Sequence, residues 1–187
     1  NTGVGSGVIS GLLTCGVIQK QFVEDNFTPQ PLGALDKNSV ELNNEQTMAV
    51  ECLRNVVRQN EFSVSLIDGV TGSGKTEVYF EVIAEVLKKG FQVLILVPEI
   101  ALARPFIERF SRRFGAAPVE WHSELPAKKR RRIWRAILEG NVNVLVGARS
   151  ALFLPFPNLG LLVVDEEHEP AFKQMEGSRY HARDMSI

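Results

Sequence analysis

The sequence predicts an α/β fold in which a mainly parallel sheet is flanked by helices on both faces. Short apolar runs rich in β-branched residues and leucine alternate with longer segments of helical periodicity, as in βαβ units. These runs lack the polar alternation of a half-exposed strand, so both faces of the sheet are expected to be buried. The chain has 187 residues, 44% of them hydrophobic, which is enough for the core of one globular domain.

The elements are expected in a regular order along the chain. Strands are predicted at 63–68, 91–97, 119–121, 142–147 and 161–165. Helices are predicted near 44–59, 75–89, 101–114 and 127–138. Gly90 and Gly115 stand where helix C-caps belong, because glycine adopts the left-handed conformation that ends many helices.

Residues 1–41 differ from the rest of the chain. Glycines interrupt a short apolar pattern, which predicts a short helix and a strand, and Pro29, Pro31 and Gly33 then predict a linker over about 26–41. The chain lacks an initiator methionine and stops at Ile187 without a capping residue. We therefore expect a fragment in which residues 42–187 form the principal domain, truncated at its C-terminal end.

Composition excludes several classes of protein. The formal net charge is -1, and no apolar run approaches the 18 or more residues that span a bilayer, which predicts no membrane partner. The N-terminus also lacks the pattern of a signal peptide, so we place the chain in the cytoplasm. Cys15 and Cys52 are too few and too far apart for a disulfide scaffold or a zinc cluster, and we expect two buried thiols.

A phosphate-binding motif follows the first predicted strand and opens a helix. The pattern GxxxxGK[ST] is matched in full by Gly69, Val70, Thr71, Gly72, Ser73, Gly74, Lys75 and Thr76. Glycines let successive backbone N–H groups turn toward phosphate oxygens, and the helix N-terminus adds partial positive charge. Lys75 is expected to meet the β and γ phosphates of a nucleotide, and Thr76 to give its hydroxyl to Mg²⁺.

Two carboxylates follow the last predicted strand. Asp165 and Glu166 should face the same crevice as the phosphate loop, because ligands bind at the carboxyl ends of parallel strands. Asp165 is assigned to the Mg²⁺ shell, and Glu166 to the water that attacks the γ phosphate. The predicted catalytic residues are thus Lys75, Asp165 and Glu166.

These motifs resemble those of superfamily 2 nucleic-acid helicases, in which the acidic motif reads DExH. Further segments narrow the resemblance to the primosomal protein N′ (PriA) family: 97–102, 121–123, 146–153, 172–174 and 179–184. The resemblance runs from about Leu42 to Ile187. It implies that residues 42–187 are the first RecA-like ATPase lobe of a P-loop helicase, and that residues 1–41 are the tail of a preceding winged-helix domain plus linker.

The resemblance also assigns residues outside the phosphate loop. By itself Gln46 reads as a residue that caps the start of a helix, since that position favours amides. In related helicases the matching glutamine reads the adenine edge, so the resemblance implies nucleotide binding by Gln46. Zinc sites of the family cannot lie here, because the cysteines are lacking.

The segment from Phe172 to Tyr180 resembles an aromatic-rich loop that couples single-stranded DNA to ATP hydrolysis. Phe172 and Tyr180 are expected to stack on unpaired bases, while Lys173, Arg179 and Arg183 engage phosphates.

The chain departs from the family pattern at two places. Ala103 and Ala148 stand where the family commonly has threonine, and each removes a hydroxyl that could have bound a phosphate. Arg149 and Ser150 remain available as DNA contacts.

A basic stretch from Arg104 to Arg135 carries ten Lys and Arg against three acidic residues. It could attract a phosphate backbone. However, the run from Lys128 to Arg132 covers more than one helical turn, so we favour a solvated helix face.

The function predicted from these features is the ATP-binding lobe of a DNA-dependent ATPase and 3′-to-5′ helicase that restarts stalled replication forks. Its implied cofactors are ATP and Mg²⁺, and its implied partners are single-stranded and forked DNA and primosome proteins. Two alternatives stay open: another superfamily 2 translocase or repair helicase, and a DNA-binding or docking module with no catalysis.

Overall fold

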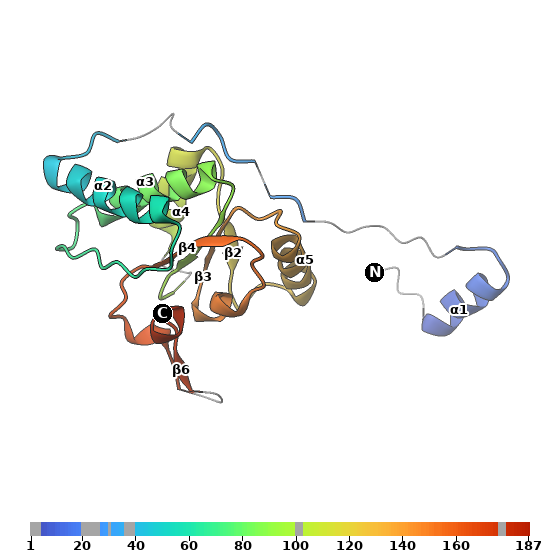
Figure 1. Ribbon diagram of the computed structural model, residues 1–187. Helices are drawn as coiled ribbons and strands as arrows, with labels where there is room; N and C mark the ends of the chain where they lie inside the picture. The colour runs from blue at the N-terminus through green and yellow to red at the C-terminus, as the bar shows by residue number, and fades with distance from the viewer. Residues whose placement is uncertain (1–4, 20–26, 30, 36–39, 100–102, 176–178) are drawn as a thin grey trace.

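A four-stranded parallel sheet organises the protein (Figure 1). The computed structural model describes residues 5–19, 27–29, 31–35, 40–99, 103–175 and 179–187. The strands are β1 (Gln92–Leu96), β2 (Val119–Trp121), β3 (Val144–Gly147) and β4 (Leu159–Val164), in the order β2-β3-β1-β4. Every neighbouring pair in this sheet is parallel, which confirms the predicted fold class.

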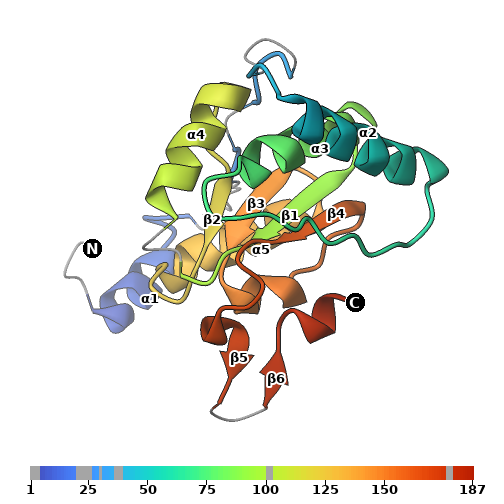
Figure 2. The ribbon, with the colours of Figure 1, turned by 90° about the vertical axis from the view of Figure 1, so that its left-hand side faces the viewer.

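Helices cover both faces of the sheet (Figure 2). The main helices are α2 (Asn44–Gln59), α3 (Lys75–Lys88), α4 (Arg104–Phe114) and α5 (Ala127–Leu138). Helices α3 and α4 pack on one face, α5 packs on the other, and α2 lies on the outer side of α3. The predicted helices at 44–59 and 127–138 match these bounds, and residues 101–102 of the predicted third helix lie outside the described residues.

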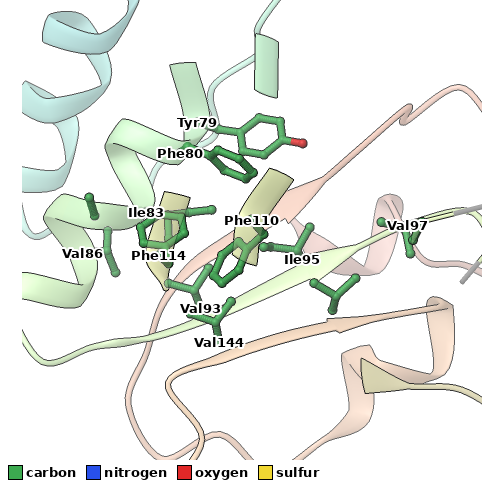
Figure 3. Close-up of a cluster of buried hydrophobic side chains, with 13 residues drawn as sticks. Tyr79, Phe80, Ile83, Val86, Val93, Ile95, Val97, Phe110, Phe114 and Val144 are labelled. Atoms are coloured by element: carbon green, nitrogen blue, oxygen red, sulfur yellow. The ribbon is translucent and has the colours of Figure 1, made fainter. Parts of the chain in front are cut away.

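The face under α3 and α4 has an aromatic core (Figure 3). Phe80 of α3 packs its ring against Phe110 and Phe114 of α4, with centroids 5.7 and 5.6 Å apart and nearly perpendicular planes. Val93 and Ile95 of β1 close this core from the sheet. Edge-to-face ring pairs add attraction to the burial itself, so this cluster fixes α3 against α4.

The opposite face is closed by α5 and by the C-terminal segment. Ile133 and Ile137 of α5 meet Leu94 and Leu96 of β1, because alternate residues of a strand point to opposite faces. Phe172 is fully buried in the same cluster. It ends the short helix η3 (Pro170–Phe172), which leads into an antiparallel pair of strands, β5 (Lys173–Gln174) and β6 (Tyr180–His181).

Ion pairs between largely buried side chains connect the helices on the face of the sheet that α3 covers. Glu81 of α3 accepts hydrogen bonds from Arg113 of α4 at 2.9 Å and from Arg54 of α2 at 3.2 Å. Arg113 also donates to the backbone carbonyl of Leu35. One carboxylate therefore connects three helices, and one arginine connects α4 to the segment before α2.

The predicted strand at 63–68 is wrong, because the structure places no strand there. The alternating side chains of Phe62, Val64 and Leu66 are 77%, 61% and 80% exposed. Strand formation requires a neighbour that accepts and donates backbone hydrogen bonds. Among the described residues the sheet contains only β2, β3, β1 and β4, so residues 63–68 pair with none of its strands.

The N-terminal region is only partly as predicted. Helix α1 (Ser6–Thr14) confirms the short helix, and it lies apart from the sheet in Figure 1. The described part of residues 1–41 contains no strand. Within the expected linker, Leu32 and Leu35 pack against the core, and the N–H of Gly33 donates to the carbonyl of Phe114 at 2.7 Å.

Both cysteines are exposed, so the prediction of two buried thiols is wrong. Cys15 follows α1, whose described side chains are not buried, and Cys52 lies on the outer face of α2. Cys52 is exposed because α2 buries a different face of the helix. Cys15 is exposed because α1 buries none of its described side chains. Among the described residues, no helix is both long and apolar enough to cross a membrane.

Candidate nucleotide-binding site

The phosphate loop enters α3 through two glycines in the left-handed conformation. Gly72 has a φ of +82° and Gly74 a φ of +84°, and Gly74 is the N-cap of α3. A side chain is strained at such angles, which explains why the motif requires glycine. No side chain among the described residues caps this helix, so its first N–H groups are available to an external acceptor such as a phosphate.

Lys75 is turned back onto the loop that precedes it. Its Nζ donates to the carbonyl of Gly69 at 2.7 Å and approaches that of Val70 at 3.5 Å. These are neutral acceptors, and a phosphate oxygen is a stronger, charged one. Lys75 therefore stabilises the loop in this conformation, and its contact with phosphates stays a prediction that requires these carbonyls to be exchanged for phosphate oxygens.

Gln46 connects the start of α2 to the phosphate loop. Its Oε1 accepts from the N–H of Asn43 at 2.9 Å, and the side chain of Asn43 accepts from the N–H of Gln46 at 2.8 Å, which together form a capping box. Its Nε2 donates to the carbonyl of Ser73 at 2.8 Å. Both ends of the amide are thus engaged, and adenine recognition by Gln46 stays a prediction that requires these bonds to be exchanged.

Asp165 lies at the carboxyl end of β4, beside the end of β1. Its N–H donates to the carbonyl of Leu96 at 2.9 Å, which continues the parallel ladder by one residue. Burial, followed by the charge of Glu166, raises the pKa of Asp165 above its ordinary value of 3.8, while Lys75 lowers it. The charge of Lys75 thus acts on Asp165, and the shared crevice of the acidic motif and the phosphate loop stays a prediction.

Glu166 is held in an unusual backbone conformation. Its φ is +50°, which is uncommon for a residue with a side chain and recurs at functional sites. The Glu166 carboxylate is partly exposed and lies 3.7 Å from the Nε2 of His168. The turn after β4 thus points Asp165 into the structure and leaves Glu166 open to solvent, which suits the different roles predicted for the two acids.

Sequence reasoning missed Tyr79, which lies beside these groups. It follows Thr76 by three residues on α3, so both side chains share one face of the helix. Burial, followed by the charge of Asp165, raises the pKa of Tyr79, and a hydrogen-bonding influence of Thr76 opposes this. The three-residue spacing from the motif threonine was the available signal in the sequence.

The groups present fit a nucleotide and Mg²⁺. Thr76 and Asp165 offer a hydroxyl and a carboxylate, and Mg²⁺ prefers such oxygen ligands together with water and phosphate oxygens. Thr76 lies in the first turn of α3, next to the open N–H groups where a phosphate chain would be held, and Asp165 lies at the end of β4. The Tyr79 hydroxyl is buried and has no hydrogen-bond partner in the described part of the chain.

The residues predicted to contact DNA are brought together around the β5–β6 hairpin, with one exception. The guanidinium of Arg149 donates to the carbonyls of Ala171 and Lys173, each at 2.9 Å, so it supports the start of the hairpin. Lys173, Arg179 and Ser150 are exposed. These positions are compatible with phosphate contacts, which stay a prediction.

Phe172 is the exception, and its prediction needs correction. The ring has no exposed surface, because it fills the core between α5 and the sheet, and it cannot stack on a base in this conformation. Tyr180 is half-buried and packs edge-on against Phe153, with centroids 5.1 Å apart. Phe153 is an exposed aromatic that sequence reasoning did not assign.

Arg183 is already paired in the structure. Its Nη1 lies 2.8 Å from Glu167 and its Nη2 lies 2.9 Å from Asp184. A phosphate contact by Arg183 would therefore have to replace one of two carboxylates. This residue connects the acidic motif after β4 with the segment after the hairpin.

Comparisons with known proteins identify the family to which the chain is similar. A family model described as DEAD/DEAH box helicase matches residues 43–185. The chain is 50% identical over 170 residues to the replication restart protein PriA of Rickettsia felis. The aligned region covers 91% of this chain and 24% of that protein. It is 40% identical over 187 residues to PriA of Bacillus subtilis, covering 100% of this chain and 23% of that protein.

The PriA of Haemophilus influenzae is 40% identical over 193 residues, covering 100% of this chain and 26% of that protein. The chain thus spans about a quarter of the length of the curated relatives it matches. The parallel α/β lobe with its phosphate loop is RecA-like, as the resemblance implied. The DEAD/DEAH box helicase model matches most of the residues of this chain, and the chain therefore belongs to the DEAD/DEAH box helicase family.

Proposed function

We propose that this chain is the ATP-binding lobe of a DNA-dependent ATPase and 3′-to-5′ DNA helicase that restarts stalled replication forks and initiates primosome assembly. The observation that carries the proposal is the phosphate loop, whose two left-handed glycines lead into the N-terminus of α3, where no side chain provides a cap. The similarity to PriA proteins along the whole chain supports the replication-restart role.

Nucleotide binding uses the phosphate loop and the ends of two elements. The N–H groups at the start of α3 bind the phosphate oxygens, and Lys75 moves from the carbonyls of Gly69 and Val70 to the β and γ phosphates. Thr76 and Asp165 hold Mg²⁺, which neutralises charge on the phosphates when bound. Gln46 reads the adenine edge from the start of α2, next to the loop that it already contacts.

Hydrolysis uses Glu166 to orient or deprotonate the attacking water. Its carboxylate is open to solvent and one residue from the metal ligand, as this role requires. An arginine that stabilises charge on the transferring γ phosphate is expected from a second lobe. We therefore expect this chain alone to bind nucleotide and to hydrolyse it slowly.

DNA binding is assigned to the hairpin side of the lobe. Tyr180 and Phe153 offer an aromatic pair on which an unpaired base can stack, and Lys173, Arg179 and Ser150 lie exposed for phosphate contacts. Arg149 positions the hairpin through two carbonyls. Because η3 leads from the acidic motif into this hairpin, DNA binding and the metal ligand are linked by a short stretch of chain.

Calorimetry with Mg²⁺-ADP tests the proposal. The wild-type chain should bind, and Lys75→Ala should weaken binding by at least about tenfold, because it loses a charge-assisted hydrogen bond worth roughly 1.5–3 kcal/mol. Lys129→Ala, which removes an exposed lysine from α5, is the matched control and should bind as wild type does. Absence of binding by the wild-type chain would refute the nucleotide site and favour the docking module.

A further inference from the structure

Helix α5 carries a concentration of positive charge that neither the core nor the nucleotide site uses. Its sequence, AKKRRRIWRAIL, contains six Lys and Arg and no acidic residue. Ile133 and Ile137 pack toward the sheet. Arg130, Arg131 and Arg135 are exposed, and among the described residues their guanidinium groups form no ion pair. These three charges are therefore open to a partner outside the lobe.

The charge is unfavourable for the helix itself. The N-terminus of a helix carries partial positive charge, which favours acidic side chains in the first turn. In α5, Lys128 and Lys129 stand there instead, and within the described part of the chain no side chain caps the helix. Arg131 and Arg135 are one turn apart, and like charges at this spacing repel each other. An anionic partner would relieve this repulsion.

An exposed indole lies on the same side of α5. Trp134 is 44% exposed, and it follows Arg130 by four residues and Arg131 by three, so these side chains are neighbours on the helix surface. In the described ranges no guanidinium stacks on its ring. Cations beside an aromatic ring suit single-stranded nucleic acid, because phosphates pair with the cations while an unpaired base stacks on the ring.

The buried side of α5 argues against other kinds of partner. A basic amphipathic helix that binds a membrane or a partner helix uses its apolar side. In α5 that side is already occupied, since Ile133 and Ile137 have no exposed surface. A DNA duplex offers phosphates, but its bases are paired and stacked and leave no face for the indole. A single strand offers both groups at once.

We propose that the α5 basic face, formed by Arg130, Arg131, Trp134 and Arg135, binds single-stranded DNA at a site separate from the β5–β6 hairpin. Figure 1 shows α5 apart from that hairpin. The arginines pair with phosphates of the strand, and one base stacks on Trp134. The choice of DNA as the nucleic acid rests on the proposed function, whereas the charge and the exposed indole do not.

The first test measures binding of fluorescein-labelled oligo(dT) by anisotropy at several salt concentrations. The variant Arg130→Gln/Arg131→Gln/Arg135→Gln removes three charges and keeps good helix formers. Each phosphate contact in a single strand contributes about 0.7 to the slope of log affinity against log salt, so the slope should fall by about 2.

A matched control removes three charges elsewhere. Arg58→Gln/Lys88→Gln/Lys89→Gln changes exposed residues at the C-terminal ends of α2 and α3, and it should leave the slope unchanged. The melting temperature of the α5 variant should equal or exceed that of the wild type, because repulsion within the helix is relieved. A lower melting temperature would overturn the inference, since the charges would then serve the fold.

Trp134 is tested by affinity and by fluorescence. Trp134→Ala should bind oligo(dT) about tenfold more weakly, because a base loses its stacking surface. Trp134→Phe keeps a ring and should bind nearly as well as the wild type. The chain has two tryptophans, and a stacked base quenches indole fluorescence. The quenching that oligo(dT) causes in the wild type should therefore be lost in Trp134→Phe.

Further outcomes separate this inference from the proposed function. A wild-type salt slope in the α5 variant, or wild-type affinity in Trp134→Ala, would overturn the inference. Tighter binding of a duplex of the same length, or equal binding of polyglutamate, would overturn it too. If only Lys173→Gln/Arg179→Gln in the hairpin weakened binding, the proposed function would stand without this site. Absence of oligo(dT) binding by the wild-type chain would refute both DNA assignments and leave the ADP site to its own test.

Discussion

The ion pair between Arg113 and Glu81 offers a measurable test of how this lobe is held together. The Arg113 side chain is 4% exposed, lies 2.9 Å from Glu81, and donates to the carbonyl of Leu35. Its guanidinium also lies 5.2 Å from the centroid of the Phe114 ring. The guanidinium thus connects α4, α3 and the segment before α2 through contacts shielded from water.

Arg113→Met keeps much of the aliphatic stem and removes the charge and its hydrogen bonds. Breaking a buried ion pair by removing one partner costs about 3–5 kcal/mol, because the other charge stays buried. Glu81 retains Arg54 at 3.2 Å, so we expect the lower end of that range, about 3 kcal/mol. The free energy of unfolding, measured by urea denaturation, gives this value directly.

A double-mutant cycle with Glu81→Gln separates the pair from the other losses. Coupling energies within such networks are about 0.5–3 kcal/mol, and we expect a value above about 1 kcal/mol here. Arg131→Met, at an exposed position of α5, is the control and should change stability by less than about 0.5 kcal/mol. A loss below about 1 kcal/mol for Arg113→Met, with no coupling to Glu81, would refute the reasoning.

Two further predictions concern the acidic motif and the edge strand. Burial, followed by the charge of Glu166, raises the pKa of Asp165 above 3.8, so the stability that this group contributes is present below that value and is lost as the pH rises through its folded pKa. Asp165→Asn should therefore stabilise the unliganded chain at neutral pH, and its free energy of unfolding should depend less on pH above 3.8. Urea denaturation at several pH values measures this, and a variant less stable than the wild type at neutral pH would contradict it. In β4, a Cβ on Gly160 would lie 2.5 Å from the Cβ and 2.8 Å from the Cγ of Phe91. Gly160→Ala should lose about 1–3 kcal/mol in urea denaturation, whereas Gly11→Ala, with open space around it, should not lose stability; equal behaviour of the two would disprove the steric argument.

Much of the fold could be predicted because it depends on local patterns. The apolar face of α5 and the buried runs of β1 and β3 are visible as periodicity, and they confirm the parallel α/β class. The predicted strand at 63–68 was wrong because a strand also needs a partner, which local patterns do not reveal. Its composition favours a strand, but pairing depends on which edge of the sheet is next to it.

The candidate site likewise contains features that local sequence determines and features that depend on packing. The phosphate loop is determined by sequence, since the left-handed angles at Gly72 and Gly74 favour glycine over residues with a side chain, and the helix that follows supplies the N–H groups. Burial could not be determined in this way. Phe172 is an aromatic beside charged residues in the sequence, yet the short helix η3 turns it into the core against α5.

Sequence by itself determined the class of fold, the phosphate loop and the acidic pair, because each is encoded by residues that are neighbours in the chain. Tertiary structure alone decided that the Tyr79 hydroxyl is buried, and that Glu81 binds arginines from two other helices. Contacts between residues far apart in the chain depend on how the helices pack over the sheet. The burial of a polar group, and with it the group's pKa and its partners, is set at that stage of folding.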